Sequence, residues 1–196
     1  MASPRPSRAP LSRTDATART ARLLDAALAL GVRGGVGALS LQAIAAEAEV
    51  SKALLLYHFA DKAALLEALV VRAAAQGARR LREASRRGQA MAAWRALLLD
   101  PAARGEAALL GALMLEQDIV PARVQGAHQE REAAATALAV AVLGDVALTP
   151  RVPDPALGRL LLRQLDGLAC AGTSMDGAAL DAELDTFALA LIGLGR

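Results

Sequence analysis

The stretch SKALLLYHFADK, residues 51–62, gathers side chains that could contact an anion, including the chain's one tyrosine and one of its two histidines. Tyr57 offers a hydroxyl on a stiff ring, and His58 offers an imidazole N–H that can gain positive charge. Lys62 adds an ammonium group four residues after His58. Contacts to nucleic-acid phosphates require donors of this kind, held rigidly in a fixed register. The alternative interpretation is that the rings lie in the core with their polar tips satisfied.

Neighbouring residues have the chemistry needed to read DNA bases. Lys52, at the start of an expected helix, is the best candidate to reach a base edge such as guanine O6 and N7. Leu54 is a candidate for apolar contact with a thymine methyl group, and packing at the domain surface is its alternative role. We expect Leu55 and Phe59 to face the core. The candidate DNA-contacting residues are Ser40, Ser51, Lys52, Ala53, Leu54, Tyr57, His58 and Lys62.

The charge of the chain is distributed unevenly along its 196 residues. Residues 1–88 contain 14 Lys and Arg against 7 Asp and Glu, whereas residues 89–196 contain 8 against 13, although the whole chain has a net charge of only +2. A basic N-terminal part on an acidic remainder indicates a polyanionic partner for the N-terminal part. Chance together with solvated helix faces is the alternative explanation.

Composition and motifs exclude several classes of protein. No apolar run reaches the ~18 residues that a membrane span needs, and the basic start MASPRPSRAPLSR lacks the apolar core of a signal peptide, so we expect a cytoplasmic protein. Cys170 is the one cysteine, so neither a disulfide framework nor a cysteine-rich zinc site is expected. There is no Ser-His-Asp or Cys-His arrangement, no glycine-rich phosphate loop and no HExxH motif. We therefore expect no enzyme, no cofactor and no metal site.

Helices must position the candidate residues, because no segment alternates as a β-strand does, and the expected class is all-α. Ser40, Ser51 and Asp61 are expected N-caps. The expected helices begin at Thr17, Leu41 and Ser51, run from Asp61 towards Arg87, and continue at 89–99, 102–117, 122–143, 154–171 and 178–194.

Two short helices joined by "AEV" form a helix-turn-helix, a motif whose second helix enters the major groove of DNA. Residues 23–69 resemble the DNA-binding domain of the tetracycline-repressor (TetR) family of bacterial transcription regulators. The matching elements are "LDAAL", "LSLQAIA", "VSK", "LYHF" and "DKAALL", in order and without a gap. The resemblance implies that Ser40, Lys52, Tyr57, His58 and Lys62 are DNA contacts. It covers about a quarter of the chain, and the remainder agrees with the family in length and helical character.

The sequence departs from the family pattern at several positions. Glu49 stands where relatives usually have a glycine, in a turn that often requires positive φ, at a cost of roughly 1 kcal/mol. Ala53 replaces another common glycine. Leu54 and Leu56 stand where relatives often have a polar residue and a tyrosine. Gly31 replaces a common phenylalanine, so either the first helix ends early or the local core is filled differently.

The expected organisation is a disordered basic arm at 1–15, a helix-turn-helix domain at 16–62, and a helical ligand-binding and dimerisation domain at 63–196. The last two helices have near-heptad apolar spacing suited to bundle packing. The resemblance implies that these helices pair with their copies in a homodimer, and burial within one subunit is the alternative. The expected interface residues are Leu157, Leu161, Gln164, Leu168, Leu180, Leu184, Phe187 and Leu191.

A cavity between the two domains is the expected site for a small-molecule effector. Aliphatic and sulfur-containing side chains are its expected apolar lining, with a few polar groups among them. The candidates are Met91, Trp94, Leu110, Met114, Gln117, Asp118, His128 and Cys170. For each polar candidate, a solvated helix face is the alternative.

Together these features predict a ligand-responsive transcription regulator that binds double-stranded DNA. Its expected action is repression, with release from a near-palindromic operator when an effector binds. The alternative is a helical small-molecule-binding protein with weak or lost DNA binding, which Glu49 and Leu56 would explain. No membrane association is expected.

Overall fold

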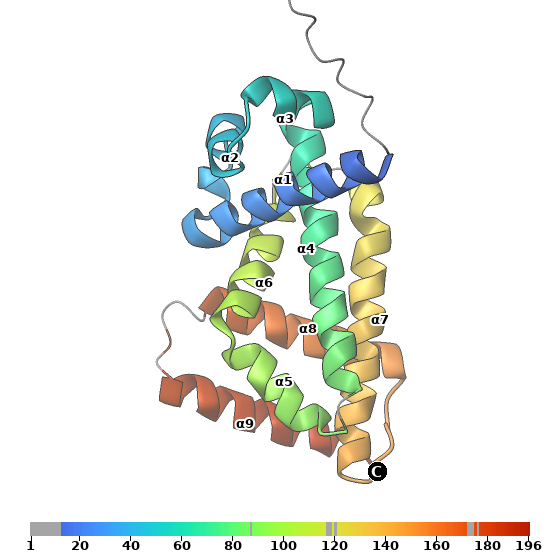
Figure 1. Cartoon of the computed structure of the whole chain (residues 1–196). Coiled ribbons are helices and arrows are strands. Elements are labelled where there is room, and N and C mark those ends of the chain that lie inside the picture. Colours follow the sequence, from blue (N-terminus) through green and yellow to red (C-terminus); the bar gives the residue numbers. More distant parts are fainter. Residues whose placement is uncertain (1–12, 87, 117–118, 120, 172–174, 176) are drawn as a thin grey trace, which may run out of the picture.

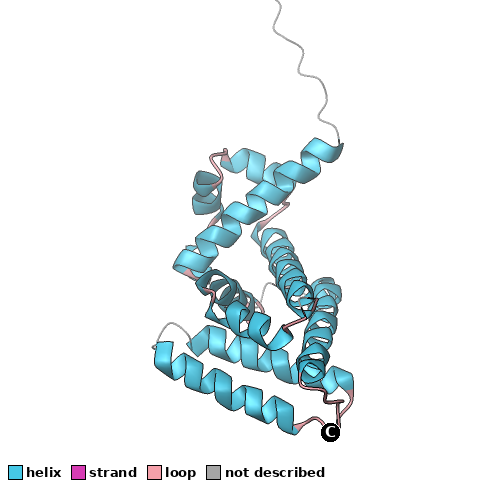
Figure 2. Ribbon diagram, turned by 60° about the horizontal axis from the view of Figure 1, so that its bottom comes forward, coloured by secondary structure: helices cyan, strands magenta, loops and turns pink. Residues whose placement is uncertain are grey.

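In the computed structural model, the described residues are 13–86, 88–116, 119, 121–171, 175 and 177–196 (Figure 1). They form α-helices joined by short loops, with a single 3-10 turn and no strand (Figure 2), so the predicted all-α class is confirmed. The helices are α1 (Arg13–Gly34), α2 (Leu41–Glu47), α3 (Lys52–His58), α4 (Lys62–Ser85), α5 (Ala90–Leu99), α6 (Pro101–Leu113), α7 (Pro121–Asp145), α8 (Asp154–Ala171) and α9 (Gly177–Gly193), and the 3-10 turn is η1 (Val36–Ala38). Within the described part, no helix is both long and apolar enough to cross a membrane.

Short helices at the N-terminal end are started by side-chain caps. Ser40 Oγ accepts a hydrogen bond from the Ala43 N–H at 3.1 Å, and Ser51 Oγ accepts one from the Leu54 N–H at 3.1 Å. The Asp61 carboxylate caps α4 in the same way. All three predicted N-caps are confirmed. They matter because helices as short as α2 and α3 are unstable without caps and tertiary packing.

The helix-turn-helix shares its apolar core with the helices below it. Ile44 of α2 and Leu55 of α3 are fully buried, and Phe59, directly after α3, is buried beside them. This core continues through the first half of α4 into α6 and the start of α7. The helix-turn-helix motif is therefore fixed to the rest of the molecule by packed side chains.

Two long helices, α4 and α7, lie side by side and connect the upper and lower parts of the molecule (Figure 1). A second core forms where their lower halves meet α5, α8 and α9. Close approach of α7 and α8 depends on Gly158, because a Cβ there would lie 2.8 Å from the backbone nitrogen of Thr136. The segment after α9 pairs with the α7–α8 loop, where the Thr149 N–H donates to the Arg196 carbonyl at 3.0 Å.

The first helix is longer than the sequence predicted at both ends. It begins at Arg13 rather than Thr17 and continues through Gly31 to Gly34. Gly31 is buried, and a Cβ there would lie 2.6 Å from Leu109 Cδ2. Leu109 of α6 therefore fills the space that a phenylalanine side chain at position 31 would take in relatives. The helix does not end early.

Candidate DNA-binding surface and central cavity

Helix α3, the second helix of the helix-turn-helix motif, separates its buried and exposed residues clearly. Leu55 is 0% exposed and Phe59 is 6% exposed, which confirms that both face the core. Between them, Tyr57 is 83% exposed. Because Leu55 and Phe59 are locked in the core, Tyr57 presents its hydroxyl to solvent from a rigid base. An exposed aromatic residue of this kind is unusual in a chain with 2% aromatic residues.

His58 links α3 to the first helix. Its Nδ1 and the Thr20 Oγ1 lie 3.1 Å apart in a part-buried hydrogen bond. The rings of Tyr57 and His58 meet edge to face, with centroids 5.5 Å apart. These contacts hold the imidazole ring in one orientation and leave Nε2 as the ring nitrogen that can meet a phosphate.

The only two lysines of the entire sequence, Lys52 and Lys62, come before and after this aromatic pair along the chain. Lys52 is the first residue of α3 and Lys62 the first residue of α4, and both are exposed. The positive end of the long helix α4 is already capped by the Asp61 carboxylate, so the Lys62 ammonium group is the charge that can meet an anion there. All other cationic side chains of the chain, apart from histidine, are arginines.

The remaining candidate residues also lie on or beside the exposed side of the motif. Ser40, Ser51 and Ala53 are exposed, and Leu54 is half-buried. The two serine oxygens accept the capping hydrogen bonds, so each hydroxyl hydrogen remains available to donate to a phosphate. Leu56 is 39% exposed and is an apolar interruption in this surface.

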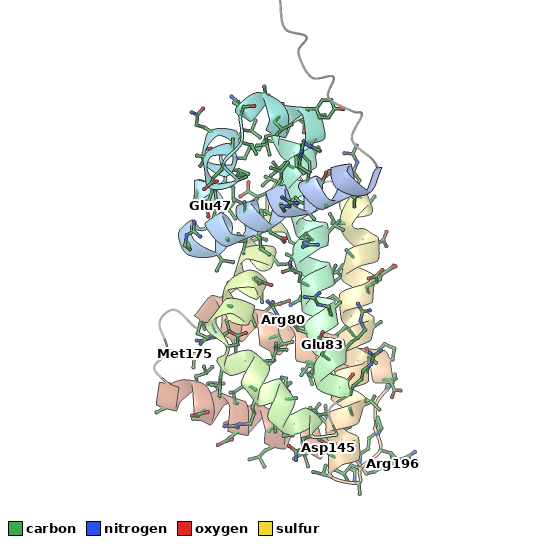
Figure 3. The ribbon with its side chains drawn as sticks, viewed as in Figure 1. Glu47, Arg80, Glu83, Asp145, Met175 and Arg196 are labelled. Atoms are coloured by element: carbon green, nitrogen blue, oxygen red, sulfur yellow. The ribbon has the colours of Figure 1, made fainter. Side chains whose placement is uncertain are left out.

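The turn between α2 and α3 contains the strain that the sequence suggested. Glu49 has φ 54°, in the left-handed region that favours glycine. The nearby Glu47 carboxylate accepts a hydrogen bond from Arg33 Nη2 at 2.7 Å, so its charge is paired with α1 (Glu47 is labelled in Figure 3). Of the two acidic residues in the motif, Glu47 is paired with Arg33, and Glu49 lies exposed in the strained turn.

A cavity lies in the middle of the molecule, between α4, α5, α6, α7 and α8, and is called the central cavity below. Its volume is about 40 Å³, more than the ~10–15 Å³ that a cavity needs in order to hold one water. Aliphatic side chains and small residues form most of its wall. The lining residues are Ala73, Gly77, Arg80, Leu81, Leu97, Leu98, Ala103, Arg104, Glu106, Ala107, Leu110, Arg131 and Leu165.

Ion pairs hold two of the three arginines that line the central cavity. Arg80 Nη2 donates to Glu106 Oε1 at 2.9 Å, Nη1 donates to Oε2, and this bonding raises the pKa of the Arg80 guanidinium (Arg80 is labelled in Figure 3). Arg131 is 4% exposed and donates from both terminal nitrogens to the Asp166 carboxylate, with Nη1 and Oδ2 3.1 Å apart. Arg104 differs, because its buried Nε has no hydrogen-bond partner among the described residues.

The residues predicted to bind a ligand lie in different parts of the structure and do not form one site. Leu110 lines the central cavity. Trp94 is 0% exposed in the lower core, 5.4 Å from the Phe187 ring, and Met91 packs against the same core. The remaining candidates lie elsewhere: Met114, His128 and Cys170 are exposed, and Gln117 and Asp118 fall outside the described residues.

Sequence reasoning missed the charged lining of the central cavity. A signal for Arg131 was present, because it shares the buried stripe of α7 with Val124, Ala135 and Leu138 at helical spacing. An arginine on an apolar stripe indicates a buried, partnered charge. The pairing of Arg80 with Glu106 and the position of Arg104 depend on helices that are distant in sequence, and no local pattern indicates them.

The residues predicted for a dimer interface are mostly buried inside the subunit. Gln164 is half-buried, and the others are between 0% and 7% exposed: Leu157, Leu161, Leu168, Leu180, Leu184, Phe187 and Leu191. They pack α8 and α9 against α5 and α7, which is the alternative that the sequence left open. The outward faces of the last two helices carry other apolar residues, Leu160 at 37% and Leu189 at 71% exposed.

Comparisons with known proteins give the fold and the N-terminal domain an independent reference. The sequence model described as "Bacterial regulatory proteins, tetR family" matches residues 23–69. Among solved structures, a transcriptional regulator from Rhodococcus sp. RHA1 is 22% identical with a TM-score of 0.70, and the match covers 90% of this chain and 97% of that one. A TetR transcription regulator from Haloarcula marismortui is 18% identical with a TM-score of 0.69, covering 92% and 100%. A TetR family transcription regulator from Marinobacter aquaeolei VT8 is 19% identical with a TM-score of 0.64, covering 94% and 100%. The comparison with curated proteins gave no match.

Proposed function

We propose that this chain, whose residues 23–69 match the sequence model of the tetR family of bacterial regulatory proteins, is a DNA-binding transcription regulator that responds to a small-molecule effector. The observation that carries the proposal is the surface around α3. Tyr57 is exposed beside an oriented His58, with the only two lysines of the chain before and after this pair in the sequence. A recognition helix supplies base contacts from its N-terminal end, while donors around it fix its register on phosphates.

We propose that the regulator acts as a homodimer. A twofold axis would place two α3 helices about 34–36 Å apart, so that they meet successive major grooves of a near-palindromic operator. Because the inner faces of α8 and α9 are used within the subunit, the partner would contact their outer faces, where Leu160 and Leu189 are exposed. Exposed apolar residues on adjacent helices support such an interface.

Repression relieved by an effector is the mode of action that the fold supports best. The helix α4 runs from Lys62, beside the DNA-binding surface, to Arg80 at the central cavity. A ligand in the cavity can therefore alter the position of the helix that carries a phosphate contact. Such a ligand releases DNA only if it binds the released geometry more tightly than the bound one.

The first test is binding to duplexes taken from the region upstream of the gene that encodes this chain, measured by fluorescence anisotropy over a salt series. We expect at least one duplex to bind far more tightly than a scrambled duplex, with the logarithm of the binding constant falling linearly with the logarithm of salt concentration. Glu49 and Leu56 are the residues that would explain a loss of DNA binding. A protein that has lost DNA binding would show no preference for any upstream duplex at any salt concentration.

A further inference from the structure

The central cavity combines an apolar wall with an excess of positive charge. Its wall includes Leu81, Leu98 and Leu165, and no charged residue comes from α5 or α8. The charged lining consists of three guanidinium groups, on α4, α6 and α7, and one carboxylate, Glu106. Even with the Asp166 carboxylate counted against Arg131, one positive charge is left over.

That excess charge belongs to Arg104. The carboxylate of Glu106 is occupied by two hydrogen bonds from Arg80, and that of Asp166 by two from Arg131. Arg104 has no ion pair with a described residue, and its Nε is buried without a partner. A buried N–H without a partner costs free energy, and a guanidinium forms its strongest hydrogen bonds with carboxylates and phosphates.

Space near the arginines is kept by a glycine. A Cβ at Gly77 of α4 would lie 3.3 Å from Arg131 Nε, a contact tighter than most real side chains make. With the volume of about 40 Å³, this restricts an occupant to a small headgroup and a short chain. A polycyclic drug-sized molecule needs a pocket of ~300–1,000 Å³.

We propose that the central cavity binds a short-chain aliphatic carboxylate, with the carboxylate on Arg104 and the chain against the leucines. The inference names the chemical class of the effector and rests on the proposed function only for its regulatory meaning. Binding itself requires no DNA. The carboxylate satisfies the orphaned Nε, and its charge balances the cavity, while Glu106 and Asp166 keep their existing arginine partners.

The test is calorimetric titration of the full-length protein, in the absence of DNA, with sodium hexanoate, hexanol and hexylamine. These probes share one chain and differ in headgroup charge. We expect saturable binding of hexanoate, binding of hexanol at least about tenfold weaker, and no binding of hexylamine, because hydrogen bonds to charged groups are worth roughly ten- to a hundredfold in affinity. Equal affinity for hexanoate and hexanol, or no saturable hexanoate binding, would overturn the proposal.

Variants identify the residue responsible. Arg104→Met should weaken hexanoate binding by about ten- to a hundredfold, and Arg104→Lys should restore part of that affinity. Arg82→Met removes an exposed charge of α4 that does not line the cavity and should leave the affinity unchanged. Unchanged hexanoate affinity in folded Arg104→Met would contradict the assignment. If hexanoate binds as expected while no upstream duplex does, the cavity proposal stands and the DNA-binding function fails.

Discussion

Lys52→Met is expected to lower affinity for the preferred operator by roughly 5- to 150-fold per half-site, because a good contact to a base edge is worth about 1–3 kcal/mol. The loss should be much smaller on a scrambled duplex, where that contact is not made. Lys52 is exposed at the start of α3, the part of a recognition helix that reaches base edges. The measurement is a set of anisotropy titrations with operator and scrambled duplexes.

Lys62→Met is the matched comparison, since it removes the other lysine and the same charge. Lys62 lies at the start of α4 and is expected to bind phosphate. Its loss should weaken operator and scrambled duplexes by a similar factor and reduce the salt slope by about one per subunit. Arg196→Met, at the opposite end of the molecule from α2 (Figure 3), should change neither quantity. Equal operator selectivity in Lys52→Met and Lys62→Met would contradict the separate roles.

Asp166→Leu is expected to destabilise the protein by about 3 kcal/mol. Arg131 has a side chain that is 5% exposed, and without Asp166 its charge would remain buried and unpaired. Breaking a buried ion pair on one side costs about 3–5 kcal/mol, and the partial exposure of Asp166 places the estimate at the lower end. The free energy of unfolding, from denaturant titrations, is the quantity to compare.

A second ion pair between the same two helices supplies the control. Arg159 Nη1 and Glu132 Oε1 are 3.0 Å apart, but the Arg159 side chain is 50% exposed. Arg159→Leu should cost at most about 1 kcal/mol, because exposed pairs contribute little. The double variant Arg131→Met with Asp166→Leu should recover most of the lost stability, since it leaves no unpaired charge. If Asp166→Leu and Arg159→Leu unfold at the same denaturant concentration, burial is not what makes the Arg131 pair important.

Local signals in the sequence predicted most of the helices. Ser40, Ser51 and Asp61 were identified as caps because a side-chain oxygen at each helix start can accept from a nearby backbone N–H. The helix at 154–171 was predicted with its observed bounds, while the one expected at 102–117 ends at Leu113. The predicted C-terminal end of α1 was wrong, because the helix continues through Gly31 to Gly34. The residue that packs against Gly31 is Leu109 of α6, which is far away in the sequence.

The two functional regions differed in how much the sequence could reveal. The candidate DNA-binding surface is one contiguous stretch, so residue types and spacing were enough to propose Tyr57 and His58. The central cavity is assembled from five helices, and no spacing within one helix relates Arg104 to Arg131. Apolar residue type was a poor guide to the lining of the cavity, because Trp94 packs in the lower core and does not line the cavity.

The most direct test of the central claim, that the surface around α3 binds DNA, is protection of the two lysines from reductive methylation. Lys52 and Lys62 are the only lysines in the sequence, and cleavage before Asp61 places each in a separate peptide that mass spectrometry can distinguish. The duplex preferred in the anisotropy titrations should slow methylation of both side chains, and an equal concentration of scrambled duplex at the same salt should not. If both lysines are methylated at the rate of the free protein while the protein is saturated with that duplex, the DNA lies on another surface and the account is wrong.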